Sequence, residues 1–95
     1  MVNVISNNDL SEAKKEKLAL LDFSATWCGP CSMLAPVLKE LSEELAGEVA
    51  VYSIDVDQNP QLAAEYKIMN IPALVLLKDG EKAGVTVGFQ PKESL

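Results

Sequence analysis

The chain has 95 residues, of which 48% are hydrophobic, and its eight lysines and fourteen acidic residues give a net charge of −6. This length supports one domain with a single core, and the longest apolar stretch, residues 73–77, is far shorter than the ~20 residues that span a membrane. We therefore expect no membrane partner. Because there is no arginine and no basic patch, we expect no nucleic-acid binding either.

The first elements expected are a short strand, a helix and a buried strand. Residues 2–5 are compatible with the first strand. Asn7 or Asn8 is expected to cap a helix over residues 9–17, whose acids come early and whose lysines come late, as the helix dipole favours. Residues 18–24 are almost continuously apolar, which is typical of a strand covered on both faces, although Asp22 interrupts them.

A long amphipathic helix is predicted to begin at Cys31 and to end at Gly47. Its apolar residues recur at helical spacing: Leu34, Val37, Leu38, Leu41 and Leu45. Pro36 lies inside this helix and leaves the carbonyl of Ser32 without its usual donor, so a kink is expected there.

The second half of the chain predicts a strand, a short helix and a hairpin. The strand covers residues 49–56, and Asn59 is expected to cap the helix over residues 60–66. Asp79-Gly80 is a strong hairpin signal between strands at residues 73–77 and 82–87.

Residues 90–95 look like the opening turn of a helix that then stops. The expected fold is therefore α/β, with a mixed central β-sheet in the order βαβαββα, helices on both faces and a truncated last helix.

The only two cysteines lie in the segment Trp27-Cys28-Gly29-Pro30-Cys31, between the apolar strand and the long helix. A pair at this spacing can close into a disulfide without a change of fold. If Cys31 opens the helix, backbone N–H groups and the positive dipole end face the sulfur of Cys28 and stabilise its thiolate. Such a pair suits attack on another disulfide.

Three other readings of the cysteine pair are a structural disulfide, a zinc site and inert thiols. Closing a loop of about four residues contributes only ~2 kcal/mol in the chain-entropy model, so the pair is a poor staple. A zinc site needs four ligands, and the chain has two cysteines and no histidine, so no metal is expected. Redox chemistry is the favoured interpretation.

Over nearly its whole length the chain resembles the thioredoxin family. The resemblance rests on blocks that follow one another at matching spacing: 21–23, 27–31, Met33-Leu34-Ala35-Pro36, Asp57-Gln58-Asn59-Pro60, Ile71-Pro72-Ala73, Lys78-Asp79-Gly80 and Val87-Gly88. It implies a single thioredoxin domain over residues 1–95.

The resemblance also assigns roles to individual residues. It implies that Cys28 is the attacking nucleophile, that Cys31 is the resolving thiol and that Asp22 is the buried carboxylate that handles the proton of Cys31. It further implies a cis peptide bond before Pro72. The substrate-docking surface that it implies is formed by Trp27, Gly29, Pro30, Ile71, Pro72, Val87 and Gly88.

Two departures from the family pattern concern residues near the site. Ser24 stands where many members carry a second tryptophan, which predicts lighter packing beneath the site. Ser53 stands where members often place a lysine beside the buried carboxylate, so Asp22 is expected to lack that partner and to have a raised pKa. We predict that the methionines Met33 and Met69 fill the core.

The function expected is that of a small cytosolic oxidoreductase that reduces disulfides in other proteins and is itself re-reduced by a thioredoxin reductase. The first residues do not have the pattern of a signal peptide, which is why a cytosolic location is expected. The five glycines form no G-x-G-x-x-G motif, so we expect no flavin or nicotinamide cofactor. We expect a monomer with at most weak association. The alternatives are a redox-independent interaction module on the same apolar surface, and a disulfide isomerase or oxidase. Those enzymes usually place a histidine between the cysteines, where this chain has Gly29-Pro30.

Overall fold

A computed structural model describes residues 2–87 and shows a mixed five-stranded sheet with the strand order β1-β3-β2-β4-β5. The strands are β1 (Val2–Val4), β2 (Leu18–Ser24), β3 (Ala50–Asp55), β4 (Ala73–Lys78) and β5 (Glu81–Val87). Strand β3 runs parallel to both β1 and β2, whereas β4 is antiparallel to β2 and β5. The helices are α1 (Ser11–Lys15), α2 (Gly29–Glu44) and α3 (Pro60–Glu65).

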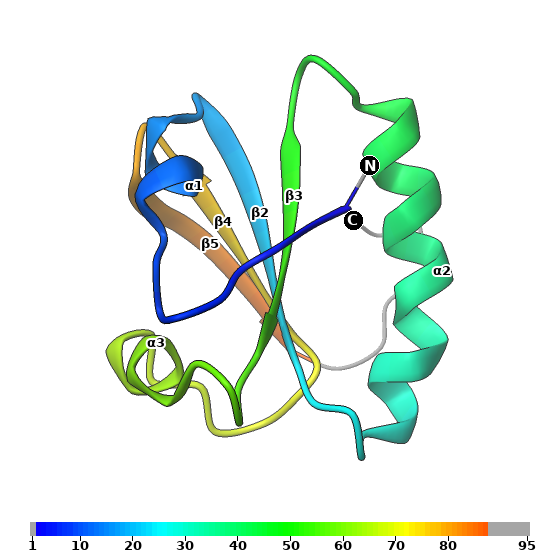
Figure 1. The fold of residues 1–95 in the computed structure, drawn as a ribbon. Helices are drawn as coiled ribbons and strands as arrows, with labels where there is room; N and C mark the ends of the chain where they lie inside the picture. The colour runs from blue at the N-terminus through cyan, green and yellow to red at the C-terminus, as the bar shows by residue number, and fades with distance from the viewer. Residues whose placement is uncertain (1, 88–95) are drawn as a thin grey trace.

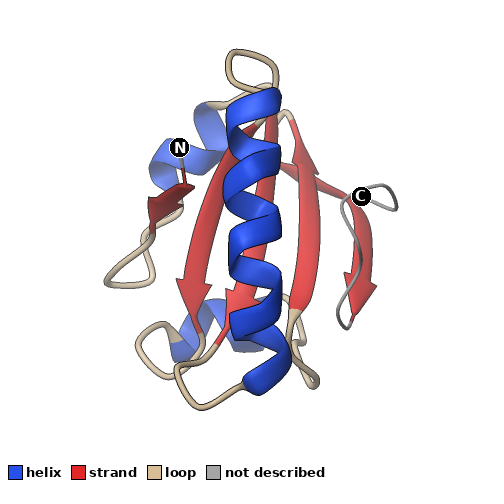
Figure 2. Cartoon of the chain, turned by 90° about the vertical axis from the view of Figure 1, so that its right-hand side faces the viewer, coloured by secondary structure: helices blue, strands red, loops and turns tan. Residues whose placement is uncertain are grey.

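Helices cover both faces of the sheet, as expected. Among residues 2–87, α2 is the one helix along one face, and α1 and α3 lie on the other (Figure 1). Figure 2 looks onto α2 and shows it crossing in front of the central strands. From β2 to β5 the structure shows the first six elements of the predicted order, βαβαββ, with β1 and α1 ahead of them. The final helix of the predicted order, over residues 90–95, lies outside the described residues.

The two faces of β2 belong to different cores because successive side chains of a strand point to opposite faces. Leu21 and Phe23 are fully buried in the larger core, with residues of α1 and α3. Leu20 packs instead against the α2 core, which contains Leu34 and Leu38. Asp22 has the same parity as Leu20 and therefore lies beneath α2.

The hairpin turn between β4 and β5 is confirmed. Asp79 and Gly80 both have positive φ, 53° and 84°, which is the backbone that a type I′ turn requires. Glycine adopts this conformation without strain, and aspartate is among the few other residues that tolerate it.

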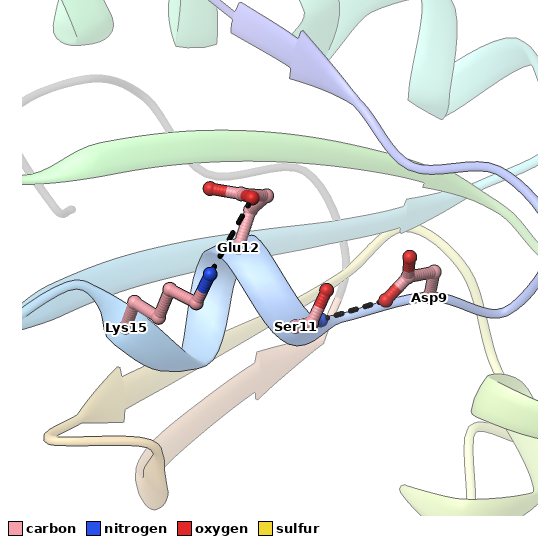
Figure 3. A network of polar contacts seen from close by, with 4 residues as sticks. All are labelled: Asp9, Ser11, Glu12 and Lys15. Atoms are coloured by element: carbon pink, nitrogen blue, oxygen red, sulfur yellow. Dashed lines mark hydrogen bonds and ion pairs between the residues drawn. The ribbon is translucent and has the colours of Figure 1, made fainter.

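Helix α1 is shorter than predicted and is not capped by either asparagine. The Oδ1 atom of Asp9 accepts a hydrogen bond from the N–H of Ser11, the first residue of the helix, at 2.9 Å (Figure 3). An exposed ion pair joins Lys15 Nζ to Glu12 Oε1 at 3.7 Å.

The side chain of Asn8 caps a different helix. Its Oδ1 accepts the N–H groups of Gln61 and Leu62, at 3.0 and 3.2 Å, in the first turn of α3. Asn59, the predicted cap of α3, makes no side-chain cap bond. It is fully buried and accepts the Asn8 N–H while donating to the carbonyls of Ile5 and Asp55. The two asparagines thus tie the β1–α1 loop to the start of α3.

The prediction that Met33 and Met69 fill the core is wrong. Their side chains are 61% and 90% exposed. Met33 lies on α2 at a position that faces away from the sheet, and Met69 lies in the loop between α3 and β4. Among residues 2–87, no helix is long and apolar enough to cross a membrane.

Candidate active site

The cysteine pair lies at the turn between the end of β2 and the start of α2. The Cys28 N–H donates to the Ala25 carbonyl at 3.2 Å, which closes the turn and brings Cys28 to the N-terminal end of α2. Pro30 lies in the first turn of α2, where its missing N–H has no partner to lose and its fixed φ suits the helix.

Cys28 and Cys31 are joined by a disulfide, with their Cα atoms 5.3 Å apart. The helix begins at Gly29, two residues earlier than predicted, and Cys28 is its N-cap residue. The Cys28 Sγ accepts the Cys31 N–H at 3.2 Å. The backbone of the first turn therefore directs an N–H group at this sulfur, which is the environment that stabilises a thiolate at a helix start.

The sulfurs are packed in a small apolar cluster. Ala25, Cys28 and Cys31 form this cluster, and Val56 and Ile71 pack against it. In the disulfide form both cysteines are 6% exposed. The Ile71–Pro72 peptide bond is cis, as the resemblance implied.

Most of the described residues in the predicted docking surface are accessible. Trp27 is 70% exposed and Val87 is 53% exposed. Gly29 and Pro30 are also exposed, and Ile71 is half-buried.

The remaining two residues of that surface differ. Pro72 is fully buried, so its ring does not contribute exposed area in this state. Gly88 lies outside the described residues.

The indole of Trp27 is held by a hydrogen bond that sequence reasoning did not predict. Its Nε1 donates to Asp57 Oδ2 at 2.8 Å. Asp57 is itself positioned by a turn in which Asp55 Oδ1 accepts the N–H groups of Asp57 and Gln58, at 2.8 and 3.2 Å. The acidic cluster after β3 was visible in the sequence, but only the parallel pairing of β2 with β3 brings it to the turn that carries Trp27.

Asp22 is buried without a partner. It is 6% exposed, and its Oδ1 has no hydrogen-bond partner among the described residues. Desolvation raises the pKa of its carboxyl from 3.8 to about 6. Ser53 is its register neighbour on β3, so a serine lies beside Asp22 on that strand.

Asp22 borders a cavity of about 550 Å³ beneath α2, which is also lined by Ala35. Ala35 lies one helical turn after Cys31, on the same side of the helix. The carboxyl therefore lies on the face of the sheet that α2 covers, and Ala35, which borders the same cavity, is one helical turn from Cys31. A buried carboxyl with a pKa near neutrality can accept a proton from a thiol and release it again near pH 7.

Comparisons with known proteins agree with this geometry. A family model described as Thioredoxin matches residues 2–95. The chain is 47% identical to a thioredoxin of Staphylococcus epidermidis over 91 residues, which cover 96% of this chain and 88% of that protein. It is 46% identical to a thioredoxin of Staphylococcus aureus over the same coverage.

The fold is also shared with a solved structure. A mutant thioredoxin from Halobacterium salinarum NRC-1 superposes with a TM-score of 0.89 at 38% sequence identity, covering 98% of this chain and 82% of that one.

Proposed function

The chain belongs to the thioredoxin family, and on that premise we propose a chemical role for each of its site residues. The protein is a dithiol/disulfide oxidoreductase that acts as a protein-disulfide reductase. In the proposal Cys28 is the nucleophile, Cys31 the resolving thiol and Asp22 the proton acceptor. The hydrogen bond from the Cys31 N–H to the Cys28 Sγ is the observation that carries it.

In the first step the Cys28 thiolate attacks one sulfur of a substrate disulfide. A bond forms between Cys28 and that sulfur, the substrate disulfide breaks, and the other substrate sulfur leaves as a thiolate and takes up a proton. The N–H groups at the start of α2 favour the thiolate of Cys28 over its thiol, which raises the fraction of reactive protein at neutral pH.

In the second step Cys31 releases the substrate. Its thiol gives its proton to the Asp22 carboxylate, and the resulting thiolate attacks the Cys28 sulfur. The mixed disulfide breaks, the second substrate sulfur leaves with the electron pair, and Cys28 and Cys31 are left as a disulfide. Two electrons have passed to the substrate. Their replacement is proposed to come from a thioredoxin reductase.

Substrate proteins are proposed to dock on Trp27, Gly29, Pro30, Ile71 and Val87, with Pro72 and Gly88 completing the surface. The exposure of Trp27 and Val87 supports this, and Trp27 directly precedes the buried Cys28. We further propose that residues 1–95 act as one domain in the cytosol, because the family match spans residues 2–95 and a reducing compartment keeps the pair available as a dithiol.

Reduction of insulin with dithiothreitol as the electron donor tests the assignment. Cys28→Ser should abolish turnover, whereas reduced Cys31→Ser, freed of dithiothreitol before insulin is added, should accumulate a covalent mixed disulfide that added dithiothreitol cleaves. Ser32→Ala, in the same helical turn, is the matched control and should keep its activity. Turnover that survives Cys28→Ser, or a mixed disulfide on Cys31 in place of Cys28, would refute the assigned roles.

A further inference from the structure

The cavity beneath α2 has a charged rim that the proposed steps do not use. Besides Asp22 and Ala35 it is lined by Val2, Leu38, Lys39, Glu43 and Ser53. Lys39 and Glu43 are four residues apart on α2 and therefore lie on one side of that helix. Both charges thus border the cavity into which the carboxyl of Asp22 opens.

Within residues 2–87, no other element brings a charge to this cavity. On the sheet side, Asp22 pairs with Ser53 of β3 and Leu74 of β4, and β1 contributes Val2. Within residues 2–87 the cavity lining therefore holds one cation, Lys39, and one acid besides Asp22, Glu43.

The Lys39 side chain is free to move toward the cavity. Lys39 is exposed, and its ammonium forms no ion pair with any described acid. A lysine can lay its flexible four-carbon stem along apolar side chains while its charge stays hydrated, and Leu38 and Ala35 offer such a surface. The uncompensated Asp22 carboxylate attracts this charge whenever it is ionised.

We propose that Lys39 is a positioning residue for release of the substrate: its ammonium stabilises the ionised form of Asp22 across the cavity, and Glu43 opposes it. This inference rests on the proposed role of Asp22 as the proton acceptor for Cys31. Lys39 on α2 thus supplies a cation near Asp22, whereas the residue beside Asp22 on β3 is the uncharged Ser53.

Titration of the Asp22 carboxyl by carbon-detected NMR in the dithiol form tests the electrostatic part directly. Lys39→Met should raise the pKa of Asp22 by about 0.5 to 1, and Glu43→Gln should lower it by a similar amount, because a nearby opposite charge favours the ionised acid and a like charge disfavours it. Lys39→Arg should restore the wild-type value.

Matched controls separate the cavity charges from net charge. Glu40→Gln removes an acid from the same helix at an exposed position that does not line the cavity, and Lys82→Met removes a lysine on β5, the strand at the opposite edge of the sheet from β1. Both should leave the pKa of Asp22 within about 0.2 of the wild type. A pKa in Lys39→Met that equals the pKa in Lys82→Met would overturn the proposal.

The second readout is the pH dependence of mixed-disulfide release in single-turnover experiments. The acidic limb of the release rate should move upward in Lys39→Met and downward in Glu43→Gln, by the same amount as the pKa of Asp22. If the pKa moves and the limb does not, the proposed role of Asp22 fails and the proposal fails with it. If Asp22→Asn removes the acidic limb of the release rate but Lys39→Met leaves the pKa of Asp22 unchanged, only the role of Lys39 is refuted.

Discussion

Replacing Asp22 by asparagine should stabilise the fold, and the gain should depend on pH. In the folded protein burial raises the pKa of this carboxyl from 3.8 to about 6, whereas in the unfolded chain it is solvated and titrates near its ordinary value. The folded state therefore retains a proton that the unfolded chain has lost. Stability is unaffected below pH 3.8, falls as the pH rises toward 6, and stays reduced above it.

The size of the effect follows from the two pKa values. One pKa unit corresponds to about 1.4 kcal/mol, so ionised Asp22 lowers the free energy of unfolding by about 3 kcal/mol above neutral pH. Asp22→Asn keeps the shape of the side chain and removes its titration. The variant should therefore exceed the wild type by about 3 kcal/mol more at pH 8 than at pH 3.

Urea unfolding of the disulfide form at pH 3 and pH 8 measures this difference. Any constant cost of the buried amide is the same at both pH values and cancels from the comparison. Glu40→Gln, an exposed acid on α2, is the control and should show almost no pH-dependent difference. An Asp22→Asn difference that is equal at pH 3 and pH 8 would show that Asp22 titrates like a surface acid and would refute the reasoning.

Two further predictions concern contacts that only the structure revealed. Asp57→Ala should free the indole of Trp27 and change the fluorescence emission of the single tryptophan. It should raise KM for protein substrates about fivefold, as expected for a hydrogen bond of ~1 kcal/mol, with kcat little changed. Asp57→Asn keeps an acceptor oxygen and should lie close to the wild type, so equal effects of the two variants would contradict this account. Asn8→Gly should lower the free energy of unfolding by about 1–2 kcal/mol because it removes the cap of α3. Asn7→Gly is its control, since Asn7 has the same left-handed backbone, with φ of 55° against 54°, but no cap bond; urea midpoints that fall equally in both variants would mean that the cap contributes nothing.

The order of the elements and the position of the redox pair could be predicted from local sequence patterns. The apolar run of β2, the helical spacing of the leucines in α2 and the Asp79-Gly80 turn are local patterns, and local patterns specify local structure. The two cysteines lie three residues apart, so their approach depends on one turn of backbone. The buried Asp22 could be inferred as well, because a carboxyl within an apolar strand has little chance of reaching water.

Tertiary structure decided the contacts between segments that are distant in sequence. Asn8 caps α3 and not α1, because the chain folds the β1–α1 loop against residues some fifty positions later. The bond between Trp27 and Asp57 spans thirty residues and requires the parallel pairing of β2 with β3. An asparagine or aspartate can serve any backbone N–H within reach, so its partner is set by which segments the fold brings together.

The exposure of Met33 and Met69 and the charged lining of the cavity beneath α2 also depend on which segments the fold brings together. A methionine satisfies a core or a surface position alike, and only the placement of α2 and the α3–β4 loop decides that Met33 and Met69 are exposed. The charges around Asp22 come from a helix that crosses its strand, and sequence spacing carries no information on that crossing. Local patterns therefore indicate the chemistry of the site, whereas the packing of α2 on the sheet decides which charged side chains border it.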